Sequence, residues 1–329
     1  MTGSIVHGEN ILEQIHLLLR RYGFYADEGL AIHGSGISRK LVDSYFKEWD
    51  SSGIDDSTFD TVKELEGIVK YKRFLVAIGG GKVIDTGKVT AGNLGLPFVS
   101  IPTTLSNDGI FSPIGVIKKN HTPESILTKP PELLILDYSI IRSSPKELLL
   151  AGIGDLISNL SAILDWKLAV KLKKDTEDIP SMELSYEGAE TFLKTEEEPF
   201  SIPFIKTLAH GLIKSGLAMQ RHGSSRPASG AEHLISHALD KILEKPLIHG
   251  IQCGFATLFT VLLHGEMGLF LRIKEFYERV GFPTTLEQVG IPEEKFREAV
   301  KLAPFLRPNR FTILHKNPEI EDALNYITR

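Results

Sequence analysis

The first half of the chain alternates short apolar runs with stretches of helical periodicity, and this alternation restricts the fold more than any other feature of the sequence. Four runs are bounded by glycine or proline and show little alternation of apolar and polar residues: 30–33, 74–78, 98–101 and 133–136. Such runs are typical of strands that helices cover on both faces. The pattern predicts an α/β fold with a parallel, doubly wound, Rossmann-like sheet.

The second half shows a different periodicity. It lacks convincing strands and contains long stretches of helical pattern: 148–169, 204–219 and 254–263. A chain of 329 residues is also longer than one hydrophobic core usually supports. We therefore expect two domains, an α/β domain at residues 1–142 and an all-helical domain at residues 143–329.

Composition and charge exclude several classes of protein. The formal net charge of -5 and the pI near 6.1 argue against a nucleic-acid binder, which usually has a strongly basic face. Polar side chains interrupt the apolar residues at 11–19, which favours an amphipathic helix over a signal or membrane-spanning segment. Cys253 is the only cysteine, which excludes an internal disulfide and a thiolate-rich metal site. We expect a cytoplasmic protein without a membrane span.

A candidate cofactor site follows the second apolar run. Residues 74–78 lead directly into Gly79, Gly80 and Gly81, and residues 82–88 look like the start of a helix. Glycines let backbone N–H groups approach a pyrophosphate, and the positive end of a helix adds favourable electrostatics. A structural tight turn is the alternative. The fingerprint G-x-G-x-x-G is absent here, so the sequence does not predict an ordinary Rossmann dehydrogenase.

A polar segment after the third run supplies further candidates. Thr103, Thr104 and Ser106 follow residues 98–101 and should lie near the carboxyl edge of the sheet, where α/β proteins bind ligands. The alternative is an ordinary polar loop, because residues 107–109 are typical of turns. The sequence alone leaves both interpretations open.

Three separated residues are candidate metal ligands. Asp155, His233 and His249 each lie at the edge of an apolar helical segment. One carboxylate and two imidazoles suit a divalent transition metal and leave coordination positions free for a substrate oxygen. Structural alternatives exist, because Asp155 could cap a helix at 156–166 and a histidine in an apolar helix is more often a core or surface residue.

The residues around the histidines add to this hypothesis. Ser229 and Glu232 form the pattern of a capping box, which would place His233 in the first helical turn and His237 one turn later on the same face. The positive end of a helix disfavours imidazolium, so it should keep His233 neutral, as a metal ligand must be. His249 is expected in a short turn between helices.

Five motifs occur in the order and approximate separation of one superfamily. They are GGGKVID at 79–85, PTTLSNDG at 102–109, GIGD at 152–155, RPASGAEH at 226–233 and HG at 249–250. Over nearly the whole chain they resemble the superfamily of glycerol dehydrogenases, iron-dependent alcohol dehydrogenases and dehydroquinate synthases. Within it, three longer strings look most like the sn-glycerol-1-phosphate dehydrogenase family, which supplies the archaeal lipid backbone: 154–168, 225–233 and 310–315.

The resemblance implies an active site in a cleft between the two domains. A catalytic zinc ion would be bound by Asp155, His233 and His249. The nicotinamide cofactor would lie over Gly79, Gly80, Gly81 and Asp85. The cleft would be lined by Thr103, Thr104, Ser106, Asp108 and Ser112. Asp108 and Asp155 would border the substrate, with Asp108 assisting proton transfer, and His237 would contact the nicotinamide or the substrate.

The resemblance also implies a reaction, the NAD(P)H-dependent, zinc-assisted and reversible reduction of dihydroxyacetone phosphate to sn-glycerol 1-phosphate. Arg226 is the first candidate for binding the substrate phosphate, and a structural role between helices is equally open. The first predicted strand ends at His33 without an acidic residue to select NADH, so we expect both NADH and NADPH to be used. We also expect a homo-oligomer.

Other functions stay open as alternatives. Glycerol dehydrogenase and a dehydroquinate-synthase-like lyase would use the same metal chemistry, and two histidines with a carboxylate also hold non-haem iron in oxygenases. A sugar-phosphate or nucleotide sensor would need no bound metal. The chain departs from the family pattern at Asn107, where many members have histidine, and in the short segment between Leu41 and Phe74.

Overall fold

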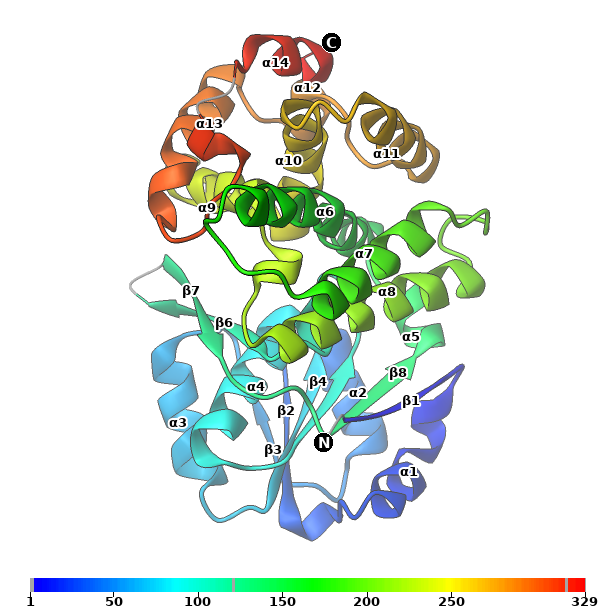
Figure 1. Ribbon diagram of the computed structural model, residues 1–329. Helices are drawn as coiled ribbons and strands as arrows, with labels where there is room; N and C mark the ends of the chain where they lie inside the picture. Colours follow the sequence, from blue (N-terminus) through cyan, green and yellow to red (C-terminus); the bar gives the residue numbers. More distant parts are fainter. Residues whose placement is uncertain (1–2, 120–121, 317–318, 329) are drawn as a thin grey trace. The chain divides into compact units, whose positions relative to one another are not determined.

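The computed structural model describes residues 3–119, 122–316 and 319–328, and it separates into two compact units. The first unit, residues 1–145, contains the sheet. The second unit, residues 146–329, is helical throughout its described elements (Figure 1). The predicted combination of an α/β and an all-helical part is therefore confirmed.

The first unit is built around a six-stranded parallel sheet with the order β1-β8-β5-β4-β2-β3. The predicted apolar runs form four of its strands: β2 (Gly29–His33), β4 (Phe74–Gly79), β5 (Phe98–Pro102) and β8 (Leu133–Asp137). Every residue of these strands is buried. Burial on both faces explains why their sequences do not alternate.

The sequence analysis missed the remaining strands. The outer strands β1 (Ser4–Gly8) and β3 (Ser51–Gly53) are short and partly exposed, so they lack a buried apolar run. An antiparallel hairpin, β6 (Ile114–Lys119) and β7 (Thr122–Leu127), was also missed. The polar segment after β5 therefore leads into a hairpin before the chain returns to the sheet at β8.

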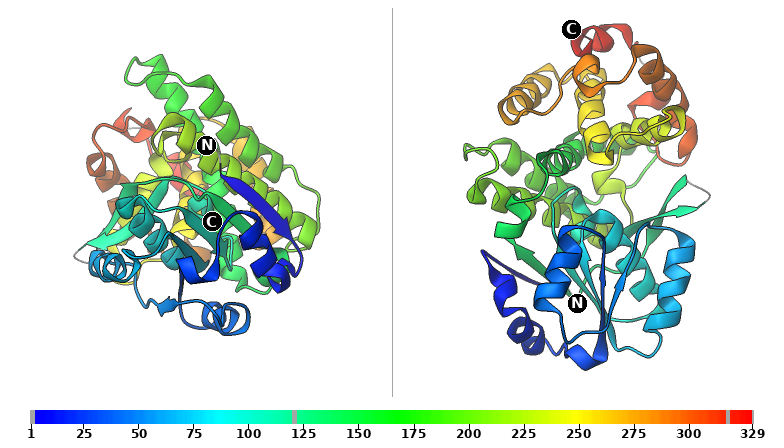
Figure 2. Two further views of the ribbon diagram at one scale, coloured as in Figure 1. Left: turned by 90° about the horizontal axis from the view of Figure 1, so that it is seen from below. Right: turned by 180° about the vertical axis from the view of Figure 1, so that it is seen from behind.

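Helices cover both faces of the sheet (Figure 2). Val76 and Ile78 of β4 belong to the core beneath one group of elements: η1 (Ile11–Gln14), α1 (Ile15–Arg21) and α2 (Ile37–Tyr45). Leu75 and Ala77 belong to the core beneath a second group: α3 (Phe59–Val69) and α4 (Gly81–Leu94). Short elements complete the unit: η2 (Ala26–Glu28), η3 (Asp108–Ile110) and α5 (Tyr138–Arg142). The two-sided packing fixes the point where β4 turns into α4.

The second unit is organised around two apolar helices that touch at glycines, α6 (Lys146–Lys171) and α10 (His249–Leu263). A Cβ atom added to Gly250 would lie 2.0 Å from the carbonyl oxygen of Ala151, so the two backbones are in direct contact. The other helices are α7 (Ile179–Leu193), α8 (Ile202–His222), α9 (Ala231–Ile242), α11 (Met267–Val280), α12 (Leu286–Val289), α13 (Glu293–Leu306) and α14 (Glu321–Ile327). Two short 3-10 turns are η4 (Arg226–Ala228) and η5 (Ile313–Lys316).

Helix α6 is also the one element of the described residues that has both the length and the apolar composition of a membrane-spanning helix. Most of its apolar stretch is buried inside the second unit, where α10, α7, α8 and α9 pack against it. This burial is what the central helix of a protein core requires.

Candidate functional site

Asp155 lies inside α6 rather than at the start of a helix. The helix begins at Lys146, so the interpretation of Asp155 as an N-cap is wrong. Gly152 and Gly154, which suggested a helix boundary, are interior residues, and at Gly154 the backbone of α10 comes too close for a side chain. Asp155 is only 5% exposed, so its carboxylate is held in the interior.

The two candidate histidines approach this carboxylate from α9 and α10. The Nε2 atoms of His233 and His249 each lie 3.9 Å from Oδ1 of Asp155. Their rings are 5.0 Å apart between centroids. Ligand atoms around a tetrahedral zinc ion with bonds of about 2.0 Å are roughly 3.3 Å apart, so a small contraction would close these three donors around a cation.

His249 is the first residue of α10, so the predicted turn between helices is wrong at this position. Its Nδ1 atom lies 3.1 Å from the Ser236 hydroxyl oxygen, and its Nε2 atom faces Asp155. Because Gly250 follows directly and touches α6, the crossing of the two helices sets the separation between His249 and Asp155.

We expect Gly250→Ala to lower the free energy of unfolding by about 1–3 kcal/mol, because the added methyl group would collide with the backbone of α6. It should also weaken metal binding, since α6 and α10 must separate to relieve the collision. Gly268→Ala in α11 is the matched control, because a Cβ there meets nothing within 4 Å. Thermal unfolding and metal content measure both effects, and equal Tm values for the two variants would contradict the prediction.

Glu232 orients the His233 ring. Its carboxylate accepts hydrogen bonds from His233 Nδ1, at 3.0 Å, and from the backbone N–H of Gly230, at 2.6 Å. An acceptor at Nδ1 places the proton there and leaves the Nε2 lone pair for a metal, as is usual for ligating histidines. The predicted capping box is only half formed, because Gly230 rather than Ser229 is the N-cap residue. The sequence analysis used Glu232 only as a helix signal and missed this role.

Cys253 lies beside the same donors. One turn after His249, its buried sulfur atom is 3.5 Å from His249 Nε2. Ligand atoms of His233, His249 and Cys253 all lie within 4.8 Å of one another. The sequence analysis used this cysteine only to exclude an internal disulfide and a thiolate-rich metal site, and did not place it near the candidate ligands. The arrangement offers oxygen, nitrogen and sulfur atoms to a cation, a mixture that suits zinc better than magnesium or calcium.

Burial and neighbouring charges shift the pKa values of both histidines. The pKa of His249 lies well below its ordinary value because the ring is buried and because positive charge on His233, His237 and Arg307 opposes its protonation. Burial also opposes a charged His233, yet Cys253 and Glu232 raise its pKa well above the ordinary value. The neutral His233 that a metal ligand must be stays a prediction, and a metal ion that binds at Nε2 would displace any proton held there.

His237 is a neighbour of the donor group. Its ring stacks on His249 with a centroid separation of 5.8 Å. Its Nε2 atom lies 3.4 Å from Nη2 of Arg307, the residue that follows α13. Burial, opposed by the contact with Asp240, lowers the pKa of His237. His237 is therefore neutral near pH 7, and its ring stacks directly on the ring of the candidate ligand His249.

Arg226 occupies a structural position in this unit. It is 3% exposed, and its Nε atom donates to the Asp175 carboxylate at 2.8 Å. Its Nη2 atom donates to the backbone carbonyls of Asp165 and Phe311. These contacts tie η4 to α6 and to the segment before η5, so the structure favours the structural role over the phosphate-binding role.

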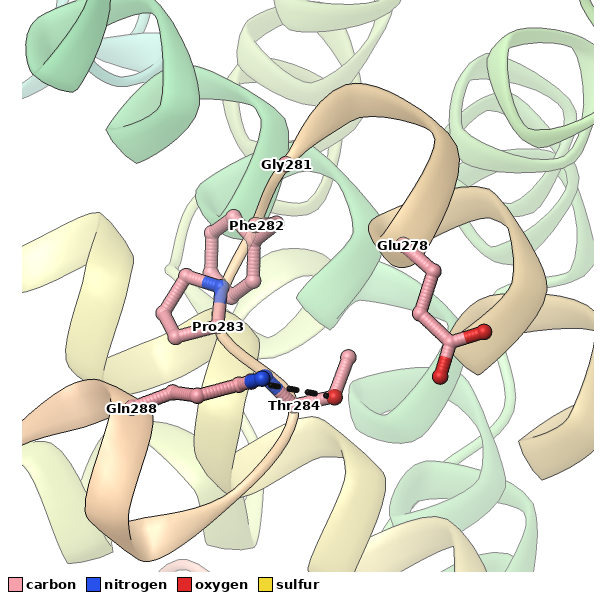
Figure 3. A pocket seen from close by; sticks show the side chains of 6 residues that line it. All are labelled: Glu278, Gly281, Phe282, Pro283, Thr284 and Gln288. Carbon is pink, nitrogen blue, oxygen red and sulfur yellow. Dashed lines mark hydrogen bonds between the residues drawn. The ribbon is translucent and has the colours of Figure 1, made fainter.

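A surface hollow of about 390 Å³ in the second unit contains none of the candidate site residues (Figure 3). It is lined by Glu278, Gly281, Phe282, Pro283, Thr284 and Gln288. The Phe282 ring is close to Gly154 and Gly254, where α6 and α10 meet. The hollow therefore lies next to the place where α6 and α10 meet. Glu278 is the only charged residue in its lining.

In the first unit, the glycine turn and the polar segment after β5 lie together. The backbone N–H of Thr103 donates to the carbonyl of Gly79 at 2.9 Å. A Cβ atom added to Gly80 would lie 3.6 Å from the Thr104 methyl group, and one added to Gly81 would lie 3.8 Å from the Ser106 hydroxyl oxygen. Gly80 is the N-cap of α4, so the turn presents the positive end of a helix next to these hydroxyl groups.

Asp85 is paired with a lysine that the sequence analysis missed. Lys88, which is 1% exposed, has its Nζ atom 3.6 Å from Oδ1 of Asp85 and donates to the carbonyls of Gly109 and Ile114 at 2.6 and 2.7 Å. Burial raises the pKa of Asp85 to about 6, against the opposing charge of Lys88. Asp85 and Lys88 are three positions apart in a helix, which places their side chains on the same face. This spacing could have predicted the pair from the sequence.

The pair fixes the segment that carries Asp108. Lys88 holds the carbonyl groups on both sides of Phe111 and Ser112. Ser112 is buried, and its hydroxyl donates to the carbonyl of Ile114, whereas Asp108 is partly exposed at the start of η3. Ser112 is therefore buried within this segment, and Asp108 is partly exposed.

Solved structures with the same fold include glycerol dehydrogenase from Schizosaccharomyces pombe, with a TM-score of 0.76 and 20% identity over 98% of this chain and 88% of that one. NADH-dependent butanol dehydrogenase A from Thermotoga maritima aligns with a TM-score of 0.68 and 17% identity, covering 100% and 97% of the two chains. At these identities, the comparisons establish the fold. In sequence, residues 6–145 match the family model of iron-containing alcohol dehydrogenases. The fold and this match over the first unit agree with the class of iron-containing alcohol dehydrogenases.

Curated relatives identify the family within this class. Glycerol-1-phosphate dehydrogenase [NAD(P)+] from Pyrococcus furiosus is 38% identical over 97% of this chain and 94% of its own length. The enzyme of the same name from Methanobrevibacter smithii is 40% identical over 84% of this chain and 79% of its own length. The chain belongs to the glycerol-1-phosphate dehydrogenase family.

Proposed function

We propose that this protein catalyses the reversible reduction of dihydroxyacetone phosphate to sn-glycerol 1-phosphate, with NADH or NADPH as hydride donor and Zn²⁺ as bound metal. The observation that carries the proposal is the convergence of Asp155, His233 and His249 on one point in a chain whose relatives are glycerol-1-phosphate dehydrogenases. The product would serve the synthesis of archaeal-type membrane lipid backbones.

The glycine turn is proposed to bind the dinucleotide. Gly79, Gly80 and Gly81 allow the pyrophosphate to approach backbone N–H groups at the start of α4. The hydroxyl groups of Thr103, Thr104 and Ser106 lie against this turn and would donate hydrogen bonds to the cofactor. Asp85 and Ser112 act indirectly in this proposal, because both side chains are buried.

The helical unit is proposed to hold the metal and the substrate carbonyl. Zinc, when bound, supplies a Lewis acid that stabilises negative charge developing on the carbonyl oxygen. The proposed ligands are Asp155, His233 and His249. The hydrogen bond from His233 Nδ1 to Glu232 leaves the His233 Nε2 atom facing Asp155. Cys253 adds a sulfur atom at the edge of this group.

Two side chains are proposed to assist the transfer of the proton that the reduction consumes. His237 is neutral and adjacent to His249, so it can position the water that protonates the new hydroxyl group. Asp108, which is partly exposed at the start of η3, is proposed to contact the substrate and assist this transfer. Each role predicts a loss of turnover, rather than of metal, when the side chain is replaced.

We expect chelation to reduce dihydroxyacetone phosphate turnover at least about tenfold, and Zn²⁺ to restore it, because the carbonyl would lose its Lewis acid. The measurement is NAD(P)H oxidation with dihydroxyacetone phosphate or dihydroxyacetone, before and after dialysis against a chelator. The chirality of the product is then assigned with a stereospecific enzyme assay. Chelator-resistant activity on unphosphorylated substrates would overturn the proposal, and an sn-3 product would overturn its stereochemistry.

The proposal extends to location and assembly. The single buried thiol suits a reducing compartment, which supports a cytoplasmic enzyme. A homo-oligomer is proposed as well, and light scattering of the purified protein tests it directly. A mass equal to that of one chain would contradict it.

A further inference from the structure

A buried carboxylate on α6, that of Asp165, contacts both of the other helices that carry candidate metal ligands. Asp165 is 0% exposed. Its Oδ2 atom accepts a hydrogen bond from the backbone N–H of Ala231, the first residue of α9, at 2.6 Å. Its Oδ1 atom accepts from Nε2 of His264, the C-cap residue of α10, at 2.9 Å. Each of α6, α9 and α10 carries one candidate ligand, and the three helices pack against one another (Figure 1).

At the start of α9, the Asp165 carboxylate supplies a cap from outside the helix. The N-cap residue is Gly230, which has no side chain that could accept a hydrogen bond from the first N–H groups. A Cβ atom added to Gly230 would lie 2.6 Å from Oδ2 of Asp165, so only glycine lets the carboxylate approach the N–H of Ala231. Ala231 is two residues before His233, and the contact therefore fixes the helical turn that carries this candidate ligand.

The second oxygen of Asp165 fixes α10 and the chain that follows α13. Besides His264, it accepts from the backbone N–H of Ile313, the first residue of η5, at 2.6 Å. His264 lies at the opposite end of α10 from His249. The contact with Asp165 holds the far end of the helix, and the close approach of Gly250 to α6 holds the near end. Together the two contacts set the position of α10 along α6.

Hydrogen bonds and an opposite charge compensate the burial of the Asp165 carboxylate. Its two oxygens accept from the three donors at 2.6–2.9 Å. The Arg226 guanidinium donates to the backbone carbonyl of the same residue at 3.3 Å. Burial lowers the pKa of Arg226, and the charges of Asp175 and Asp165 oppose this shift. A carboxylate whose acceptor positions are filled in this way specifies one location for each of its partners, which an apolar side chain would not do.

We propose that Asp165 is a positioning residue for the metal centre. By holding the start of α9 and the end of α10 against α6, it sets the separation at which the three candidate ligands can bind one cation. The inference rests on the proposed function, which supplies those ligands. Both histidine Nε2 atoms lie 3.9 Å from the Asp155 carboxylate, so a shift of either helix would move a donor out of reach of a shared metal ion.

The test is the zinc dissociation constant of the purified protein, measured by competition with a chromophoric chelator. In Asp165→Asn the amide NH₂ group cannot accept, so at least one of the three donors loses its acceptor. We expect zinc to bind this variant about tenfold more weakly or worse, the usual loss when a residue that orients metal ligands is replaced. His264→Leu removes the α10 contact alone and should weaken binding about two- to tenfold, the value of one hydrogen bond. This second variant keeps the inference testable if Asp165→Asn does not fold.

Asp137→Asn is the matched control. Asp137 is also a buried carboxylate that accepts backbone N–H groups, but it belongs to the first unit. Its replacement should reduce stability and leave zinc affinity within about twofold of the wild type. The visible spectrum of bound Co²⁺ gives a readout that lower stability alone would not change, because it reports ligand geometry. At saturating Co²⁺ the spectrum of Asp165→Asn should differ from that of the wild type, and the spectrum of Asp137→Asn should not.

Two results would overturn the inference: wild-type zinc affinity in both Asp165→Asn and His264→Leu, or an equal loss of zinc affinity in Asp165→Asn and Asp137→Asn. A wild-type protein that binds zinc and cannot reduce dihydroxyacetone phosphate would instead overturn the proposed function. That outcome would leave the role of Asp165 intact, because neither metal measurement depends on turnover.

Discussion

His249→Ala is expected to lose the bound metal and to reduce turnover by about a thousandfold or more, while dinucleotide binding stays close to the wild-type level. The variant removes one of the two imidazole donors that lie 3.9 Å from the Asp155 carboxylate. A Lewis acid at a carbonyl contributes several kcal/mol to stabilising developing charge, which corresponds to at least about three orders of magnitude in rate. The proposed dinucleotide turn consists of residues 79–81, which belong to the first unit, whereas α10 belongs to the second.

The measurements are metal content by mass spectrometry, steady-state kinetics and NADH titration by fluorescence. His210→Ala is the matched control, because His210 is exposed on α8 and should be replaceable without loss of metal. Unchanged metal content in His249→Ala would remove this residue from the ligand set. Loss of NADH binding together with metal would show that the variant disturbs more than the donor group.

Lys88→Met is expected to lower the free energy of unfolding by about 3–5 kcal/mol, the usual cost of removing one member of a buried ion pair. The variant leaves Asp85 buried without its cation and deprives the carbonyl groups of Gly109 and Ile114 of their donor. Urea unfolding measures the loss. Hydrogen exchange should rise most at residues 81–116, because Lys88 holds this part of the first unit together.

Two variants make the Lys88 prediction specific. Lys82→Met changes a lysine of the same helix whose side chain is 64% exposed, so it should cost less than about 0.5 kcal/mol. Asp85→Asn combined with Lys88→Met should be less destabilised than Lys88→Met alone, because no charge then remains buried. A loss below about 1 kcal/mol for Lys88→Met would contradict the prediction.

The parts of the fold that the sequence predicts are those whose burial is complete. β4 and β5 are apolar without alternation because helices cover both of their faces, and the same pattern marks β2 and β8. Strands β1 and β3 were missed because edge strands are half exposed, and β1 in addition pairs with a strand that is distant in sequence. A pattern within a short window carries no information about such partners.

The candidate site also consists of residues that the sequence could predict and residues that it could not. Asp155, His233 and His249 could be selected from residue type and context, and the structure brings their side chains together. Helix ends were less accurate, because Gly154 is a helix breaker by propensity and a packing requirement in the structure. Glu232, Lys88 and Cys253 were missed because their roles depend on which atoms they face, and only tertiary structure determines that.

The pairing of β1 with β8 has a consequence for how the chain reaches this fold. The carboxylate of Asp137, at the end of β8, accepts hydrogen bonds from the backbone N–H groups of Asn10 and Leu12, across 127 and 125 positions of the sequence. Closing so long a loop has a large entropic cost, which only the assembled sheet can offset. The amino-terminal strand should therefore dock late during folding, and until then the open edge of β8 is a template on which other chains can aggregate.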